Sequence, residues 1–247
     1  MLTQVKNIIA VASGKGGVGK STITALSALS LSNDFNIGIL DADIYGPNQH
    51  IIFNIDNLKP EIVQKDSKKY LKPLVSNNIK IASMGSILDD DKAAVWRGPM
   101  LSGAIKQLIH STDWGNLDLL IVDMPPGTGD AYLTVAGELD LDGVILVTTP
   151  NRLAINDTIK SIHTFNKLNV PILGFIENMN FPSIATEDIF LDKNIERITQ
   201  IPFDENIYNM SITNTQNLSD EIKFFLTNIL SFYTLFIFPY VVIKHLY

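Results

Sequence analysis

Short, almost continuously apolar runs alternate along this chain with segments of helical spacing. The runs are rich in β-branched residues and end at turn-forming residues; they occupy residues 8–13, 37–40, 79–82, 119–122, 144–147 and 172–176. Runs without polar alternation are typical of parallel strands that are covered on both faces. Amphipathic helical spacing is found at residues 20–31, 101–109 and 153–168. We therefore predict an α/β fold, a doubly wound and mostly parallel sheet flanked by helices.

A glycine-rich loop follows the first apolar run, and its spacing of glycines, lysine and serine is that of a Walker A phosphate-binding loop (P-loop). Glycines allow backbone N–H groups to turn inward around phosphate oxygens, and the following helix adds the positive end of its dipole. We expect Lys20 to bind the β- and γ-phosphates of a nucleotide and Ser21 to bind Mg²⁺. The predicted nucleotide-binding residues of this loop are Gly14, Lys15, Gly16, Gly17, Val18, Gly19, Lys20, Ser21 and Thr22.

Carboxylates follow two of the predicted strands. Asp41 and Asp43 come at the end of one apolar run, and Asp123 ends another. Open parallel sheets bind ligands at the carboxyl ends of their strands, so these side chains are expected beside the P-loop. Asp123 has a Walker B arrangement and is predicted to hold Mg²⁺, directly or through water. Asp41 is interpreted either as part of the ligand site or as a cap where the strand turns.

Composition excludes several classes of function. The chain has 247 residues, a net charge of −7 and no cysteine, which rules out disulfides, cysteine-ligated zinc and a cysteine nucleophile. The acidic balance argues against a nucleic-acid partner, because no surplus of Lys and Arg exists. The lysine-rich residues 57–78 are therefore interpreted as a solvated hairpin or loop. No secretory signal opens the sequence, so we expect a cytoplasmic protein.

A second lysine in the loop, Lys15, makes the motif more specific. The pattern Lys-Gly-Gly-Val-Gly-Lys-Ser-Thr resembles the deviant Walker A motif of the P-loop NTPases that include MinD, ParA and the nitrogenase iron protein. The resemblance implies a homodimer with nucleotide at its interface, in which Lys15 reaches the partner's nucleotide. It also places residues 41–47 in switch I, where Asp43 orients the attacking water. The expected catalytic residues are Lys15, Lys20 and Asp43.

Further blocks resemble one branch of that family, the Mrp (ApbC) group of iron–sulfur cluster carrier ATPases. The blocks are residues 5–13, 41–47, 95–100, 123–130, 176–179 and 201–204, and the resemblance covers roughly residues 4–210. It implies binding of an iron–sulfur cluster and its transfer to apoproteins. In this group an Asn after the last core strand contacts adenine, a role that carries over to Asn178.

The chain departs from this group where the cluster ligands are expected. In the group, a Cys-x-x-Cys pair follows Asn-Met within about a dozen residues and holds the cluster at the dimer interface, whereas this chain has no cysteine. Ser183 and Thr186 are no replacement, because neutral hydroxyls are poor ligands for iron. The histidines show no paired ligand spacing; they are His50, His110, His163 and His245. We therefore predict no iron–sulfur ligands in these residues.

Residues 224–247 are interpreted as an apolar C-terminal tail that follows a P-loop ATPase domain at residues 1–223. Residues 224–243 carry no charged side chain and are just long enough to span a hydrocarbon core of about 30 Å. Polar residues dilute the segment and Pro239 breaks its helix, so a packed tail is favoured over membrane contact and over a membrane span.

Three functions stay open. The first is a Mg-ATP-dependent dimeric ATPase of the iron–sulfur carrier type. The second is a degenerate carrier that keeps nucleotide binding only, and the third is a MinD/ParA-like localisation protein switched by nucleotide. The block Trp-Arg-Gly-Pro-Met at residues 96–100 favours carrier ancestry, and the uniformly apolar tail differs from the basic, amphipathic tails of MinD-like proteins.

Overall fold

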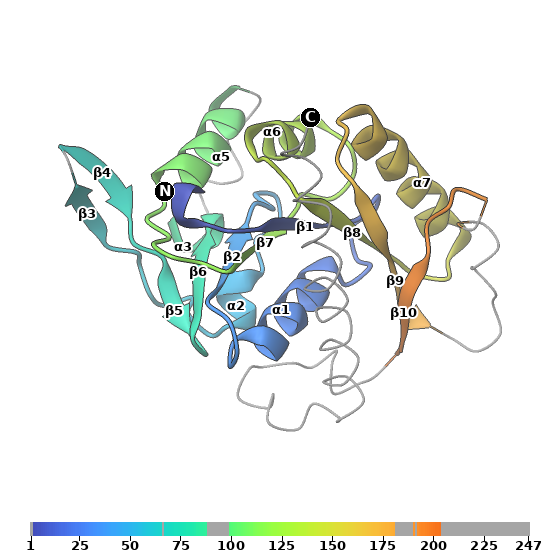
Figure 1. The fold of residues 1–247 in the computed structure, drawn as a ribbon, viewed down its shortest axis with the longest axis horizontal. Coiled ribbons are helices and arrows are strands. Elements are labelled where there is room, and N and C mark those ends of the chain that lie inside the picture. The colour runs from blue at the N-terminus through green and yellow to red at the C-terminus, as the bar shows by residue number, and fades with distance from the viewer. Residues whose placement is uncertain (1, 66, 88–98, 181–189, 191, 204–247) are drawn as a thin grey trace, which may run out of the picture.

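The centre of the molecule is a mostly parallel sheet (Figure 1). The structure is a computed structural model that describes residues 2–65, 67–87, 99–180, 190 and 192–203. Eight strands follow the spatial order β10-β9-β8-β1-β7-β2-β6-β5. Their bounds are β1 Ile8–Ala12, β2 Ile37–Asp41, β5 Leu74–Ser76, β6 Ile79–Ser83, β7 Leu119–Asp123, β8 Gly143–Thr148, β9 Ile172–Asn180 and β10 Arg197–Pro202. Neighbouring strands are parallel except β5, which is antiparallel to β6.

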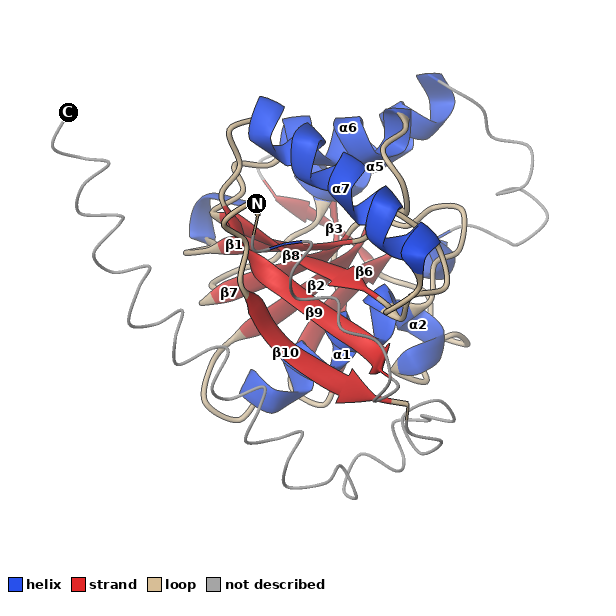
Figure 2. Cartoon of the chain, turned by 90° about the vertical axis from the view of Figure 1, so that its right-hand side faces the viewer, coloured by secondary structure: helices blue, strands red, loops and turns tan. Residues whose placement is uncertain are grey.

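Helices cover both faces of the sheet, as the sequence predicts. Three helices lie on one face; they are α5 Pro99–Ser111, α6 Asp130–Glu138 and α7 Arg152–Lys167. Figure 2 shows these helices on one side of the strands and α1, Lys20–Leu31, on the other. Two short helices, α2 Gln49–Ile52 and α3 Met84–Ile87, follow β2 and β6. The predicted fold class, a doubly wound α/β sheet, is confirmed.

The core is divided by the sheet into two apolar clusters. Alternate residues of one strand face opposite sides: Ala10 of β1 packs in the cluster under α5–α7, while Ile9 and Val11 pack with residues of α1. All five residues of β1 are buried, and so are all five of β2 and β7. Each large aliphatic side chain buried in this way contributes roughly 1.5–3 kcal/mol to stability. The continuous apolar runs in the sequence are therefore explained by burial on both faces.

The strand order determines where the polar residues meet. β1 lies beside β7, and β7 lies beside β2, although the three strands are far apart in the sequence. The register places Asp123 of β7 opposite both Val11 of β1 and Asp41 of β2. The P-loop connects β1 directly to α1. The loop and the two carboxylates therefore share the carboxyl edge of the sheet, where open α/β sheets bind ligands.

The lysine-rich segment contains a hairpin, one of the two forms expected from its sequence. Strands β3, Ile62–Lys65, and β4, Lys68–Leu71, pair antiparallel, and the hairpin extends away from the sheet in Figure 1. Two lysines of the segment form ion pairs that neutralise part of its positive charge. Lys65 Nζ lies 2.5 Å from Asp113 Oδ2, and Lys72 Nζ lies 3.1 Å from Glu61 Oε2.

Several sequence predictions fall outside the described residues. The apolar tail at 224–247, the boundary after 223, most of the block at 95–100, and both Ser183 and Thr186 are among them. Within the part of the chain that the structure describes, no helix has the length and apolar character needed to cross a bilayer.

Candidate functional site

The P-loop adopts backbone conformations that favour glycine. Gly17 and Gly19 have φ angles of 81° and 87°, in the left-handed region that other residues resist. A Cβ atom on Gly19 would also overlap the side-chain amide of Asn178. No atom lies within 4 Å of where a Cβ would stand on Gly16 or Gly17, so this part of the loop leaves open space for a ligand. The loop therefore has the backbone conformations and the open space that a phosphate cradle needs.

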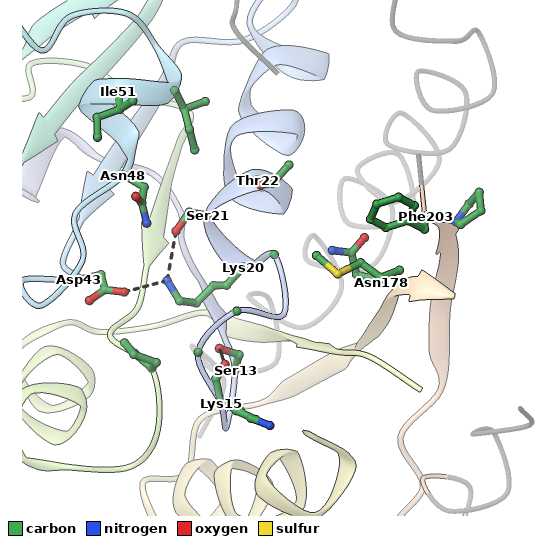
Figure 3. Close-up of a pocket in the computed structure, with 17 residues that line it drawn as sticks. Ser13, Lys15, Lys20, Ser21, Thr22, Asp43, Asn48, Ile51, Asn178 and Phe203 are labelled. Carbon is green, nitrogen blue, oxygen red and sulfur yellow. Dashed lines mark hydrogen bonds and ion pairs between the residues drawn. The ribbon is translucent and has the colours of Figure 1, made fainter. Parts of the chain in front are cut away.

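Lys20 lies at the base of this cradle, buried between carboxylates. Its Nζ atom lies 2.5 Å from Asp123 Oδ1, 3.6 Å from Asp43 Oδ2 and 3.5 Å from Ser21 Oγ. Figure 3 shows the side chain extending toward Asp43 and Ser21. Burial alone would lower the pKa of Lys20, but the charges of Asp123 and Asp43 outweigh it and raise the pKa, so Lys20 is a cation in the site.

Asp123 is fully buried and is held through both carboxylate oxygens. Oδ1 accepts the hydrogen bond from Lys20, and Oδ2 accepts one from Gln49 Nε2 at 2.8 Å. The same Gln49 amide donates to the main-chain oxygen of Ser21 at 2.9 Å. The two predicted magnesium ligands, Ser21 and Asp123, are thereby joined by one side chain, Gln49, that belongs to none of the recognised sequence motifs.

Asp41 and Asp43 have different surroundings. The Oδ2 atom of Asp41 accepts hydrogen bonds from the backbone N–H groups of Asn48 and Gln49, at 3.1 and 3.0 Å, and from Ser83 Oγ at 2.8 Å. These bonds support the capping interpretation of Asp41, because they fix the start of α2. Burial, together with the charge of Asp123, raises the pKa of Asp41 to about 7.

Asp43 lies nearer to the loop and lines the cleft beside it. Its Oδ1 atom accepts from the backbone N–H of Gly46 at 3.2 Å, which shapes the turn after β2. Burial raises the pKa of Asp43, and the charge of Lys20 opposes that shift. Strand β2 ends at Asp41, so Asp43 is positioned by a turn rather than by strand alternation.

A cleft of about 370 Å³ brings most of the predicted residues together. It is lined by Ser13, Lys15, Gly16, Gly17, Gly19, Lys20, Ser21, Thr22, Asp43, Asn48, Ile51, Ile52, Pro126, Asn178, Met179, Pro202 and Phe203. Three predicted residues do not line it: Gly14 packs against the backbone of α7, Val18 is in the core, and Asp123 lies behind Lys20. Lys15 is exposed, and its ammonium group points away from Lys20 (Figure 3).

Asn178 borders the cleft, but it lies within β9 rather than after the last core strand, and β10 follows it. Its Nδ2 atom donates to the carbonyl of Val18 at 2.9 Å, so it also braces the P-loop. The next residue, Met179, has a φ of 54°, a strained value for a residue with a side chain. Met179, Pro202 and Phe203 form an apolar wall beside Asn178, which the sequence analysis did not predict.

The donor set fits a magnesium nucleotide and does not fit an iron–sulfur cluster. A hydroxyl and a carboxylate, on Ser21 and Asp123, are hard oxygen ligands of the kind that Mg²⁺ accepts together with phosphate oxygens and water. Among the described residues no group of three or more His, Asp or Glu side chains is arranged to hold a metal ion by itself. Iron–sulfur clusters are held chiefly by thiolates, and the sequence contains no cysteine.

Comparison with known proteins agrees with this geometry. The sequence model of the ParA group described as NUBPL iron-transfer P-loop NTPase matches residues 4–223. This chain belongs to that family. The resemblance stated from the deviant Walker A motif and the carrier-type blocks is therefore confirmed, and the chain is a NUBPL-family P-loop NTPase.

Relatives of this NUBPL-family chain are named for iron–sulfur chemistry and for nucleotide binding. An iron-sulfur cluster carrier protein from Pseudomonas fragi is 49% identical over 180 residues, which cover 72% of this chain and 62% of that protein. A nucleotide-binding protein from Archaeoglobus fulgidus, solved with ADP, is 32% identical and has a TM-score of 0.72; the match covers 85% of this chain and 87% of that one.

The fold is also found in a more distant protein. The septum site-determining protein MinD from Pyrococcus horikoshii, solved with Mg-ADP, is 21% identical with a TM-score of 0.68, over 91% of this chain and 94% of that one. This likeness concerns the fold alone. The chain spans less than two thirds of the length of the curated carrier proteins that it matches.

Proposed function

We propose that this NUBPL-family chain is a Mg-ATP-dependent ATPase. The observation that carries the proposal is Lys20, a buried cation at the base of a glycine cradle, within reach of Asp43, Asp123 and Ser21. Phosphoryl transfer needs positioning and charge stabilisation more than covalent chemistry, and these groups supply both. The ADP bound to the 32%-identical relative supports an adenine nucleotide as the ligand.

Each residue has a role in this proposal. The loop backbone from Gly14 to Gly19 and Lys20 hold the phosphates, and Asp43 orients the attacking water. Ser21 and Asp123 hold Mg²⁺, which when bound neutralises charge on the phosphate oxygens. Asn178 contacts the adenine, next to the apolar wall of Met179 and Phe203.

Lys15 completes the site in a homodimer. Its side chain is exposed and extends outward from the loop, so it is available to a nucleotide held by a second copy of the chain. In this arrangement Lys15 offsets charge on the partner's transferred phosphoryl group, and hydrolysis depends on dimerisation.

Replacing Lys20 tests the proposal. Lys20→Ala is expected to abolish ATP hydrolysis, because it removes the cation that binds the phosphates. Lys160→Ala on the exposed face of α7 is the matched control and should hydrolyse ATP at the unsubstituted rate. Steady-state phosphate release measures both. Retained turnover in Lys20→Ala would mean that the site is wrongly assigned.

Lys15→Ala tests the dimer. Hydrolysis and nucleotide-dependent dimerisation are expected to be lost, while the monomer keeps most of its nucleotide affinity. Calorimetric titration with ATP measures the nucleotide affinity of the variant. Sedimentation with and without ATP measures its nucleotide-dependent dimerisation. A variant that dimerises and hydrolyses ATP normally would remove Lys15 from the mechanism.

A role in carrying iron–sulfur clusters is the second part of the proposal. The curated relatives are named as cluster carriers, and the family is one of iron-transfer proteins. From this family membership we propose that the chain is a cytoplasmic ATPase that takes part in delivering iron–sulfur clusters to apoproteins. Thiolates of this chain have no role in the proposal, because its 247 residues include no cysteine.

A degenerate carrier that keeps only its nucleotide chemistry is the second candidate, and the missing cysteines favour it. Anaerobic iron–sulfur reconstitution of the purified chain distinguishes the two. Bound iron with charge-transfer absorption would support carriage, whereas absence of both would support the degenerate carrier.

A further inference from the structure

Gln49 joins three parts of the site, and the roles proposed above do not include it. It is the first residue of α2 and is fully buried. Its backbone N–H donates to Asp41 Oδ2 at 3.0 Å. Its side-chain Nε2 donates to the Ser21 carbonyl oxygen at 2.9 Å and to Asp123 Oδ2 at 2.8 Å. One residue thus connects α2 with the start of α1 and the end of β7.

The orientation of the Gln49 amide follows from its partners. Both contacts of the nitrogen are acceptors, so the oxygen cannot take its place. The oxygen, Oε1, is buried and has no hydrogen-bond partner among the described residues. A buried acceptor without a partner lowers stability, and an apolar side chain of similar length would avoid that cost. What the glutamine contributes here is therefore the pair of hydrogen bonds that its nitrogen donates, to Asp123 and to the Ser21 carbonyl.

The carboxylate of Asp123 explains the need for this amide. Its Oδ1 atom is bonded by Lys20 and its Oδ2 atom by Gln49. Binding of phosphates by Lys20, as proposed above, redirects the lysine away from Asp123. Within the described residues, Gln49 is then the side chain that still donates to this carboxylate and fixes its orientation.

We propose that Gln49 is a positioning residue for the magnesium site. Its amide orients Asp123 toward Mg²⁺ and ties α2 to the P-loop, so the gain in ATP affinity that Mg²⁺ gives depends on it. The inference rests on the proposed ATPase function and adds to it the residue that links switch I to the Walker B carboxylate.

The test replaces Gln49 by methionine, which keeps an unbranched chain of similar length but has no amide. Gln64→Met, on the exposed strand β3, is the matched control. Calorimetry gives the Kd of ATP in EDTA and in Mg²⁺, and thermal unfolding gives Tm. We expect Gln49→Met to bind ATP in EDTA like the control and to lose about 10-fold to 100-fold of the tightening by Mg²⁺, as for a lost hydrogen bond to a charged group. Its Tm should fall, because Asp123 Oδ2 and the Ser21 carbonyl lose a donor, and unchanged ATP binding in EDTA shows that the site is still folded.

Three results would overturn the inference. Full magnesium tightening in Gln49→Met would show that the amide does not position Asp123. A lower Tm together with weaker binding in EDTA would show a merely structural role. An unsubstituted chain that binds no ATP would remove the proposed function and this inference together, whereas ATP binding with an unchanged magnesium effect in the variant removes the inference alone.

Discussion

Asp41 is a carboxyl group that is fully buried beside another carboxylate. Burial and the charge of Asp123 raise its pKa from 3.8 to about 7, against hydrogen bonds from Gln49 and Ser83 that favour the ionised form. Between these two values the folded state binds the proton that the unfolded state has already released. The contribution of Asp41 to the free energy of unfolding is therefore full below pH 3.8 and is lost as the pH rises through about 7.

This linkage predicts how Asp41→Asn changes pH dependence. The unsubstituted chain should lose stability between pH 3.8 and about 7 through Asp41, and burial raises the pKa of Asp43 in the same direction. In Asp41→Asn the decline should be shallower, because the side chain no longer titrates. Urea unfolding at several pH values measures the two curves. Parallel curves would show that Asp41 keeps an ordinary pKa in the folded state.

The residues that the sequence predicted are those whose chemistry is contained in a short motif. Lys20 and Ser21 follow from the P-loop spacing, and Asp123 follows from its position after an apolar strand; all three meet in the structure. Gln49 has no such signal, because its partners Ser21 and Asp123 lie 28 and 74 residues away and depend on the strand order. The one local hint is that Gln49 comes just after the recognised block at residues 41–47.

At the scale of elements, the start of the P-loop packs directly against the backbone of α7. A Cβ on Gly14 would overlap the backbone of Asp157 in that helix, whereas a Cβ on Gly16 would meet no atom within 4 Å. The loop therefore depends on the close approach of a helix that begins about 140 residues later in the sequence.

These two glycines provide a matched pair for a stability test. Gly14→Ala is expected to lower the free energy of unfolding by about 1–3 kcal/mol, because the methyl group must push the loop and α7 apart. Gly16→Ala is expected to stay within about 1 kcal/mol of the unsubstituted chain, since its Cβ meets open space. Chemical denaturation measures both. Equal losses in the two variants would contradict the packing argument.

Elements buried on both faces were predictable from the sequence, and edge elements were not. β1, β2 and β7 have continuous apolar runs because helices cover both sides of them. β10 is at the edge of the sheet and is mostly half-exposed or exposed, so it lacks such a run. α6 is a nine-residue helix of weak amphipathic pattern that starts directly after the glycines of residues 127–129. Partial exposure weakens the apolar signal of β10, and short length weakens the periodic signal of α6.

At the scale of the whole molecule, the sheet order assembles the site. Three segments that are separate in the sequence, the P-loop, switch I and the Asp123 segment, meet because β1, β7 and β2 are neighbours. The 32%-identical protein solved with ADP has a similar fold, with a TM-score of 0.72. None of these three segments contains a cysteine, so the site they form does not depend on one.

The central claim is that this machinery hydrolyses ATP and that a second copy of the chain completes it. The most direct measurement is the rate of phosphate release from Mg-ATP per chain, over a range of protein concentrations. A rate per chain that rises with concentration and then levels off is predicted, because dimers form and Lys15 reaches the partner's nucleotide. No phosphate release at any concentration, with the chain folded, would contradict the claim.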